Sequence, residues 1–334
     1  MRRCLIIFLL SLLFASPGNA IITVGGDGRL LTPPTGSYRD SGVQFTGNWG
    51  SFVGTAVGPH HFITAGHVGG GIGDVFTLND KEYTAEGLTA VEGTDLAIWR
   101  VRERFPVWAQ LYDKKDETGK EIILYGRGCR RGHPFIFDGV MHGWLWGKSD
   151  DSLSWGRNRV EGRKALPGGA EMLIFGFDRS SGDEEGTVGR GDSGGGVFTQ
   201  DGTTWKLAGV IYASGGQYSR VKKGTQPFMA ALYETRGLYQ NTGEEWKQHD
   251  LYSPYSEPTL AFATRISPHA AAIRAIIGID GMKKESHPLS TRIYVIIVVS
   301  ILILFIILLG FKPRRKNRLQ ADDSWYHSTE SGKE

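Results

Sequence analysis

Residues 188–198 read VGRGDSGGGVF, where a single serine, Ser193, lies among five glycines. Such a stretch is typical either of a flexible surface turn or of a nucleophile held on a backbone too sharply bent for larger residues. In acyl transfer the carbonyl oxygen becomes an oxyanion, and backbone N–H groups must reach it unobstructed. The amides of Gly191 and Ser193 can point into one pocket if the chain bends here. The stretch therefore predicts an oxyanion hole beside Ser193.

A serine hydroxyl becomes a nucleophile only when a base takes its proton and a third group orients that base. His67, in HFITAGHVGG, follows an apolar run at the mouth of a glycine-rich turn, which would fix a base on a rigid scaffold. Asp95, in EGTDLAIWRV, opens an apolar run where a carboxylate is otherwise unfavourable. The ordinary alternatives are a solvated turn histidine and a turn or capping aspartate.

The body of the chain alternates short β-branched and aromatic runs with Gly, Asp, Asn and Pro breaks, as in HHFITAGHV, EIILYGRG and KLAGVIYA. This rhythm predicts an all-β sandwich or barrel. The stretch PHAAAIRAIIG at 268–278 has the punctuation of a terminal helix. With 334 residues, 40% of them hydrophobic, the chain suits one large all-β domain or two smaller ones.

Both ends of the chain predict export and anchoring. Residues 1–20 combine two arginines, a short apolar run and small residues near Ala20, which indicates a signal peptide. Residues 293–311 form 19 uncharged residues, long enough for a helix across a bilayer core of about 30 Å. The lysines and arginines that follow predict a cytoplasmic tail at 312–334, basic and then polar. Residues 279–292 would be the stalk, and the body would be periplasmic or extracellular.

The composition argues against several classes of partner and cofactor. The formal net charge of +3 is too small to argue for nucleic acid. Cys4 would leave with the signal peptide, so Cys129 stays alone and no internal disulfide can form. The histidines show neither an HExxH motif nor paired Cys-His spacing, and we expect no metal and no cofactor.

Three stretches in order, ITAGHV, DLAIW and GDSGGGVF, resemble the motif blocks of the chymotrypsin-like (trypsin-family) serine peptidases. The resemblance covers roughly 21–278, including YGRG at 125–128, LAGVIYASGG at 207–216 and FATRISPHAAAIRAI at 262–276. It implies two antiparallel six-stranded β-barrels and a C-terminal helix, and a protein or peptide substrate. The implied roles are general base for His67, orienting acid for Asp95 and nucleophile for Ser193, with the Gly191 and Ser193 amides as oxyanion hole.

The resemblance also implies a substrate pocket. The residue at the bottom of the pocket would be Thr187. The wall would be Tyr212, Ala213 and Ser214, within the strand that resembles the substrate-pairing strand. An uncharged residue at the bottom of the pocket does not indicate cleavage after Arg or Lys. A shifted alignment could instead place Glu184 or Glu185 there, which leaves the specificity open.

Two departures complete the comparison with this family. Its activated N-terminus pairs with the aspartate before the nucleophile, here Asp192, and IITVGG follows the expected signal cleavage. Signal removal could thus free the activating amine of Ile21. The segment at 217–261 is longer than the family needs, and either walls the pocket or is a surface insertion.

The leading interpretation is a disulfide-poor, membrane-tethered serine endopeptidase of bacterial type that acts on exported or envelope proteins. The alternative is a catalytically silent or cleft-blocked protease-fold binding module at the membrane surface.

Overall fold

The computed structural model describes residues 21–149, 151–166, 169–222, 224–243, 245–255 and 257–278, which belong to one compact unit. The predicted signal peptide, stalk, spanning helix and tail lie outside these ranges. Within them, no helix is both long and apolar enough to cross a bilayer. The described chain is mostly β, as the sequence predicted.

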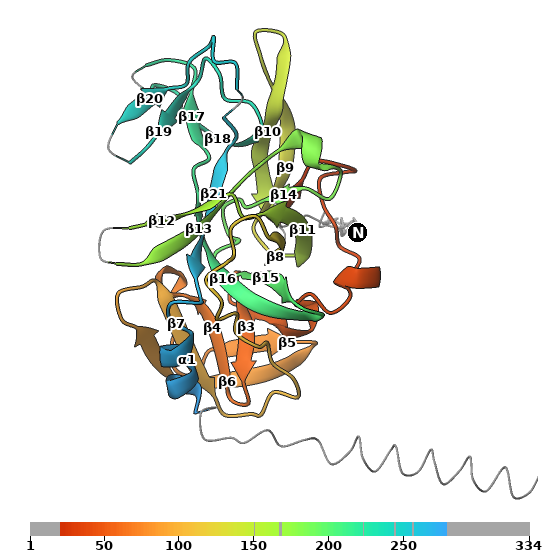
Figure 1. Ribbon diagram of the computed structural model, residues 1–334, viewed down its shortest axis with the longest axis vertical. Coiled ribbons are helices and arrows are strands. Elements are labelled where there is room, and N and C mark those ends of the chain that lie inside the picture. The colour runs from red at the N-terminus through yellow and green to blue at the C-terminus, as the bar shows by residue number, and fades with distance from the viewer. Residues whose placement is uncertain are drawn as a thin grey trace, which may run out of the picture. The chain divides into compact units, whose positions relative to one another are not determined.

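The first half of the unit is a closed antiparallel barrel of six strands, as the sequence predicted (Figure 1). Phe62 and Phe76 stack in its interior with ring centroids 4.2 Å apart, and Trp49 packs on Phe62 at 5.0 Å. Aromatic and β-branched side chains alternate inward on these strands and fill the barrel. In barrel order the strands are β2 (Thr46–Trp49), β3 (Phe52–Gly58), β4 (His61–Ala65), β7 (Leu96–Val101), β6 (Lys81–Val91) and β5 (Val75–Leu78).

The second half is a seven-stranded antiparallel sheet, where the sequence predicted a second closed barrel of six strands. The difference lies at Val160 and Glu161, which divide one stretch of chain into the two edge strands of the sheet. This stretch pairs with β8 before the two residues and with β13 after them. The Val160 amide donates to the Lys120 carbonyl at 3.0 Å and the Glu161 amide to the Ile174 carbonyl at 2.9 Å, so both pairings continue up to the bend. In sheet order the strands are β11 (Ser154–Arg159), β8 (Glu121–Gly126), β15 (Gly196–Asp201), β16 (Thr204–Ser214), β21 (Leu260–Arg265), β13 (Glu171–Gly176) and β12 (Gly162–Ala165).

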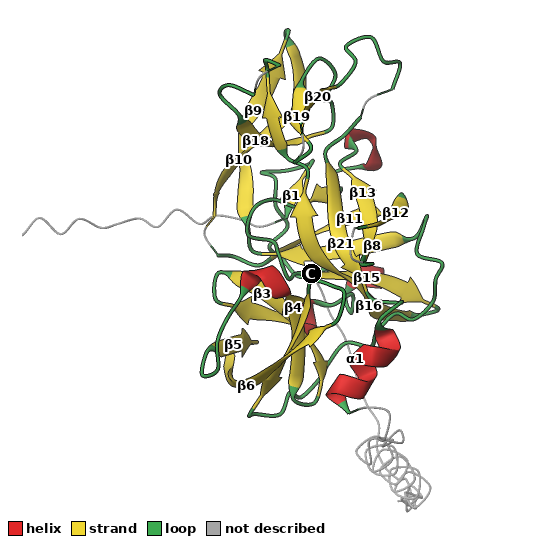
Figure 2. Cartoon of the chain, turned by 90° about the vertical axis from the view of Figure 1, so that its left-hand side faces the viewer, coloured by secondary structure: helices red, strands yellow, loops and turns green. Residues whose placement is uncertain are grey.

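A third sheet, of six strands, is built from two segments far apart in the sequence. The hairpin of β9 and β10 pairs with the 217–261 segment through β10 and β18, where Gly143 lies opposite Leu232. This segment therefore folds together with the hairpin around a small core that the two share. Both cartoon views place the third sheet at the end of the unit opposite the barrel (Figures 1 and 2). Its strands are β20 (Trp246–Gln248), β19 (Tyr239–Asn241), β17 (Gln217–Ser219), β18 (Phe228–Leu232), β10 (Val140–Ser149) and β9 (Cys129–Phe137).

The remaining described elements are short. The predicted terminal helix is present as α1, which ends at Gly278 in the left-handed conformation (φ 71°), as helices commonly do. The strands β1 and β14 pair with each other. These elements are α1 (Ala270–Ile277), β1 (Ile22–Thr23), β14 (Gly186–Thr187) and the 3-10 helices η1 (Gly36–Tyr38), η2 (Val43–Phe45), η3 (Gly66–Val68) and η4 (Arg179–Ser181).

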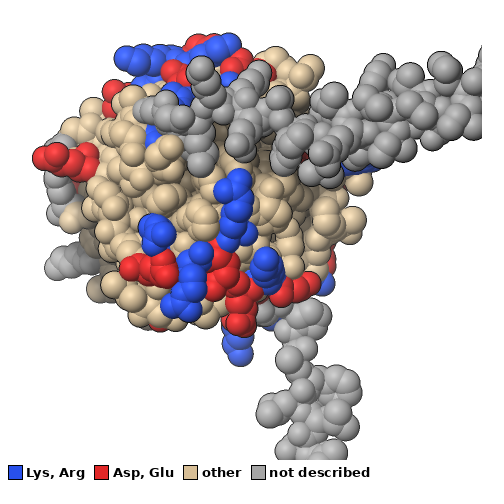
Figure 3. Space-filling view, turned by 90° about the horizontal axis from the view of Figure 1, so that it is seen from below, with Lys and Arg blue, Asp and Glu red and all other residues tan. Residues whose placement is uncertain are grey.

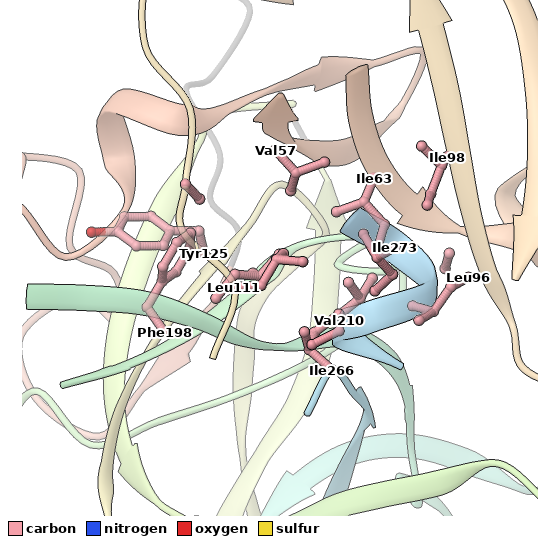
Figure 4. Close-up of a cluster of buried hydrophobic side chains, with 14 of the residues drawn as sticks. Val57, Ile63, Leu96, Ile98, Leu111, Tyr125, Phe198, Val210, Ile266 and Ile273 are labelled. Atoms are coloured by element: carbon pink, nitrogen blue, oxygen red, sulfur yellow. The ribbon is translucent and has the colours of Figure 1, made fainter. Parts of the chain in front are cut away.

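One apolar cluster joins the barrel to the seven-stranded sheet (Figure 4). Val57 and Ile63 enter it from the barrel, Phe198 and Val210 from the sheet, and Ile273 from α1. All five side chains are at most 1% exposed. Because burial of apolar surface contributes about 25 cal/mol per Å², this cluster holds the two halves against each other.

Basic and acidic side chains are interspersed on the face seen from the barrel end (Figure 3). In the barrel, Glu86 pairs with Arg102 at 3.2 Å and with Arg100 at 2.5 Å. Opposite charges at such short range largely cancel each other's field.

A buried ion pair ties the end of β21 to the loop before β8. Arg265 Nε and Nη2 donate to the Glu117 carboxylate at 2.8 and 2.7 Å, and Ser267 Oγ donates to it at 2.6 Å. The side chains of Arg265 and Glu117 are only 2% and 1% exposed. Hydrogen bonds to this arginine and serine hold the pKa of Glu117 below its usual range although burial alone would raise it.

We expect Arg265→Met to lower the free energy of unfolding by about 3–5 kcal/mol, because it leaves the Glu117 carboxylate buried without its cation. Urea unfolding followed by fluorescence measures this change. The control is Arg274→Met, which removes a partly exposed pair with Asp113 and should cost at most about 1 kcal/mol. Equal losses in both variants would contradict the prediction.

Candidate active site

His67 lies on η3, immediately after β4 ends at Ala65. The ladder between β4 and β7 places Ala65 opposite Leu96, which brings Asp95 beside the histidine. The Gly66 amide donates to the Asp95 carbonyl at 2.7 Å, and the His67 amide donates to Asp95 Oδ1 at 2.9 Å. Backbone pairing thus fixes the relative position of the two residues.

The side chains of His67 and Asp95 form a directed pair. Asp95 Oδ2 lies 2.6 Å from His67 Nδ1, while its other oxygen is held by the backbone. A carboxylate only accepts, so Nδ1 carries a hydrogen and the neutral ring presents a lone pair at Nε2.

Ser193 reaches this lone pair from the seven-stranded half. Its Oγ lies 2.8 Å from His67 Nε2, so the hydroxyl donates to the imidazole. The three residues predicted as a triad, His67, Asp95 and Ser193, are therefore brought together, although 126 positions separate the histidine from the serine. Two come from the barrel and one from the loop before β15.

The loop that carries Ser193 is held from below by Asp192, which is fully buried. Its carboxylate accepts from the amides of Gly128 at 2.7 Å and Gly189 at 2.8 Å. Burial raises the pKa of Asp192 to about 7, and backbone amides oppose that rise. Among the described residues, the groups that lower the pKa of Asp192 are backbone amides, and none of them is a cation. The sequence reasoning missed Gly128, and its place in YGRG was the available signal.

The glycines after Ser193 are required by close approach of other backbone. A Cβ on Gly194 would lie 2.1 Å from Thr64 Oγ1 and 2.2 Å from the Val53 carbonyl oxygen, both in the barrel. A Cβ on Gly195 would lie 1.9 Å from the Tyr125 carbonyl oxygen. The glycine-rich stretch is thus a compressed junction between the two halves, and no flexible surface turn.

The predicted oxyanion residues lie on the same bend. Gly191 has φ +100°, and a Cβ there would lie 2.8 Å from Gly128 Cα. In the described chain, the amides of Gly191 and Ser193 donate to no backbone carbonyl. Neither amide is therefore used in the backbone hydrogen bonding of this bend.

The end of β16 lies at the site. The Tyr212 ring meets the His67 ring edge-on, with centroids 5.6 Å apart. The β15 pairing of β16 ends at Val210 and Ile211, where Ile211 N donates to Gly195 O at 2.8 Å. Ala213 and Ser214 continue to pair with β21 on the other side. In the described chain, Tyr212–Ser214 therefore has a free edge on the side of Ser193.

Thr187 and Ser214, predicted to line a pocket, each have a buried hydroxyl without a hydrogen-bond partner among the described residues. Thr187 is fully buried in β14, opposite Ile22. The alternative acids are occupied elsewhere: Glu184 accepts from Arg157 at 3.3 Å, and Glu185 receives the Asp178 amide at 3.4 Å.

Ile21 is fully buried and lies beside Asp192 in the structure. A Cβ on Gly126 would lie 2.2 Å from Asp192 Oδ1 and 2.9 Å from Ile21 Cδ1. Ile21 and Asp192, the two residues that the sequence linked to activation, therefore both lie next to Gly126.

The lone cysteine, Cys129, is buried and unpaired, and burial raises the pKa of its thiol to about 12. In the ranges that the structure describes, no group of three or more His, Cys, Asp or Glu residues could hold a metal ion.

No protein-family model matches the sequence, and no curated protein is similar to it. Solved structures are similar at low identity. A crystal structure of an inactive mutant of Rv3671c from M. tuberculosis H37Rv is 14% identical with a TM-score of 0.43, over 79% of this chain and 99% of that chain. A second, of the Rv3671c protease in an inactive form, is 15% identical with a TM-score of 0.42, over 75% and 99%.

Glu185 gives a prediction about stability near the site. It is 6% exposed, and burial raises its pKa from 4.5 to about 8. The folded protein therefore binds this proton more tightly than the unfolded chain does. The free energy of unfolding should fall as the pH rises from about 4.5 to about 8.

We expect Glu185→Gln to remove on the order of 3–5 kcal/mol of this fall. Urea unfolding of both proteins between those pH values measures it, and Asp192 contributes equally to both. Glu184→Gln, at a half-exposed pair, is the control. A pH dependence unchanged by Glu185→Gln would contradict the assignment.

Proposed function

We propose that this chain is a serine endopeptidase that hydrolyses peptide bonds through an acyl-enzyme intermediate. The observation that carries the proposal is the continuous pair of short contacts, 2.6 Å from Asp95 to His67 and 2.8 Å from His67 to Ser193. This arrangement activates a serine hydroxyl for attack on a carbonyl.

The reaction follows from the donors and acceptors. Ser193 Oγ attacks the peptide carbonyl carbon while His67 Nε2 takes its proton. Asp95 stabilises the resulting imidazolium through Nδ1, and the Gly191 and Ser193 amides receive the oxyanion. The imidazolium then protonates the leaving amine, and the neutral ring afterwards activates water to release the acyl group.

The free edge at Tyr212–Ser214 supports an extended peptide as substrate, since a peptide can add there as a further strand. The residues assigned to the pocket, Thr187, Tyr212, Ala213 and Ser214, carry no charge, so cleavage after Arg or Lys is not favoured. A signal peptide cleaved before Ile21 would export the enzyme, and a helix at 293–311 would tether it to a membrane. Its substrates would then be exported or envelope proteins.

We expect Ser193→Ala and His67→Ala to abolish labelling of the full-length protein by a fluorophosphonate, which reacts only with an activated serine. Removal of a triad member costs at least about 10⁴-fold in rate. Gel fluorescence of membranes that contain each variant measures the labelling. A folded, unlabelled wild type would instead support the catalytically silent or cleft-blocked binding module.

We further propose that removal of residues 1–20 activates the enzyme. The free amine of Ile21 would pair with Asp192, which now has backbone amides for partners and a pKa raised to about 7. A buried carboxylate gains several kcal/mol from a paired cation. The pair would hold the loop that carries Ser193 in place.

We expect one alanine inserted between Ala20 and Ile21 to reduce the labelling rate at least tenfold, because it moves the amine by one residue. Asp192→Asn should have the same effect. Mass spectrometry of the N-terminus confirms where each chain begins. Full labelling of a protein that keeps the added alanine would refute this activation step.

A further inference from the structure

A chain of side chains connects the third sheet to the end of β16. Gln240, on β19, donates from Nε2 to the Gly215 carbonyl oxygen at 2.6 Å. His249 Nε2 lies 3.0 Å from Gln240 Oε1, and Glu257 Oε2 lies 2.6 Å from His249 Nδ1. All four residues lie outside the triad and its loop.

Gly215 follows directly after the free edge of β16. Its amide donates to the Leu260 carbonyl at 2.9 Å, which continues the pairing with β21. Its carbonyl is held by Gln240, and the next carbonyl, of Gly216, accepts from Ala230 N of β18 at 2.8 Å. The third sheet therefore fixes the chain at the point where β16 leaves the seven-stranded sheet.

The donors and acceptors in this row of hydrogen bonds can be assigned. A backbone carbonyl only accepts, so the amide nitrogen of Gln240 faces Gly215 and its oxygen faces His249. That oxygen accepts from His249 Nε2, which must carry a hydrogen. The carboxylate of Glu257 faces the other ring nitrogen, Nδ1, at 2.6 Å.

The support behind Gln240 is partly buried. The His249 side chain is 7% exposed, whereas Glu257 is 55% exposed. The backbone of His249 pairs with Leu238 at 2.9 Å and Gly237 at 3.0 Å. The ring therefore has a fixed place from which it orients the Gln240 amide.

We propose that Gln240 is a positioning residue for substrate: it holds the Gly215 carbonyl so that the Tyr212–Ser214 edge is aligned to receive an extended peptide. This inference rests on the proposed peptidase function. In this proposal the 217–261 segment aligns the edge on which the peptide pairs. It acts away from the bond that is cut.

The test compares Gln240→Met with Asn241→Leu in the full-length protein. Met keeps the length of Gln and removes the donor to Gly215. Asn241 lies on the same strand, and its Nδ2 donates to Gln217 Oε1 at the same 2.6 Å, so its removal tests general damage to the sheet. A third variant, Gln240→Glu, keeps the size but offers a carboxylate with no hydrogen to donate.

For a peptide that extends several residues on the acyl side, we expect Gln240→Met and Gln240→Glu to raise KM about three- to tenfold, the effect of one hydrogen bond. The kcat and the fluorophosphonate labelling rate should not change. A single-residue ester, too short to pair with the edge, should keep its KM in every variant, and Asn241→Leu should behave as wild type.

An unchanged KM for the long peptide in both Gln240 variants would overturn the inference while labelling still supports the peptidase. An equal rise of KM in Asn241→Leu would also overturn it, because the effect would then belong to the sheet as a whole. A wild type that is not labelled would overturn the proposed function together with the inference. If Gln240→Met does not fold, Gln240→Glu decides alone.

Discussion

The organisation of the site depends on how closely the Ser193 loop is pressed between the barrel and the seven-stranded sheet. The positions after the serine have barrel atoms on one side, Thr64 Oγ1 and the Val53 carbonyl, and the Tyr125 carbonyl of β8 on the other. No side chain fits there, since a Cβ would lie about 2 Å from these atoms. The same compression leaves Ser193 at the bend, where its hydroxyl contacts His67 of the barrel half.

The triad is a consequence of this junction. His67 and Asp95 are fixed by the β4 and β7 ladder, whereas Ser193 belongs to the other half, so the 2.8 Å contact between Ser193 and His67 requires the halves to keep their relative position. The apolar cluster of Val57, Ile63, Phe198, Val210 and Ile273 supplies the cohesion. Buried Asp192 fixes the loop locally, at the cost of an ionisable group in a dry place.

Within the described ranges, the third sheet adds a layer that is not hydrogen-bonded into the strand ladders of the barrel or of the seven-stranded sheet. The hairpin of β9 and β10 and the 217–261 segment have separate places in the sequence, yet they pair into one sheet. That sheet contacts the end of β16 at Gly215 and Gly216. It also contacts the start of the described chain, where Arg131 donates to the Val24 carbonyl at 2.8 Å.

The sequence by itself determined the all-β class and the terminal helix, because strand rhythm and helix punctuation are local signals. The resemblance to a family implied the first barrel, and unusual local settings singled out His67, Asp95 and Ser193 as candidates. Only the tertiary structure decided the rest. The bend at Val160 and Glu161 divides one stretch of chain into the two edge strands of the seven-stranded sheet, and neither residue is a turn signal in the sequence. The burial of Glu185 and the contact of Gln240 with Gly215 are long-range as well. Pairing partners and burial are set by which distant segments share space, and no local pattern of residues encodes that.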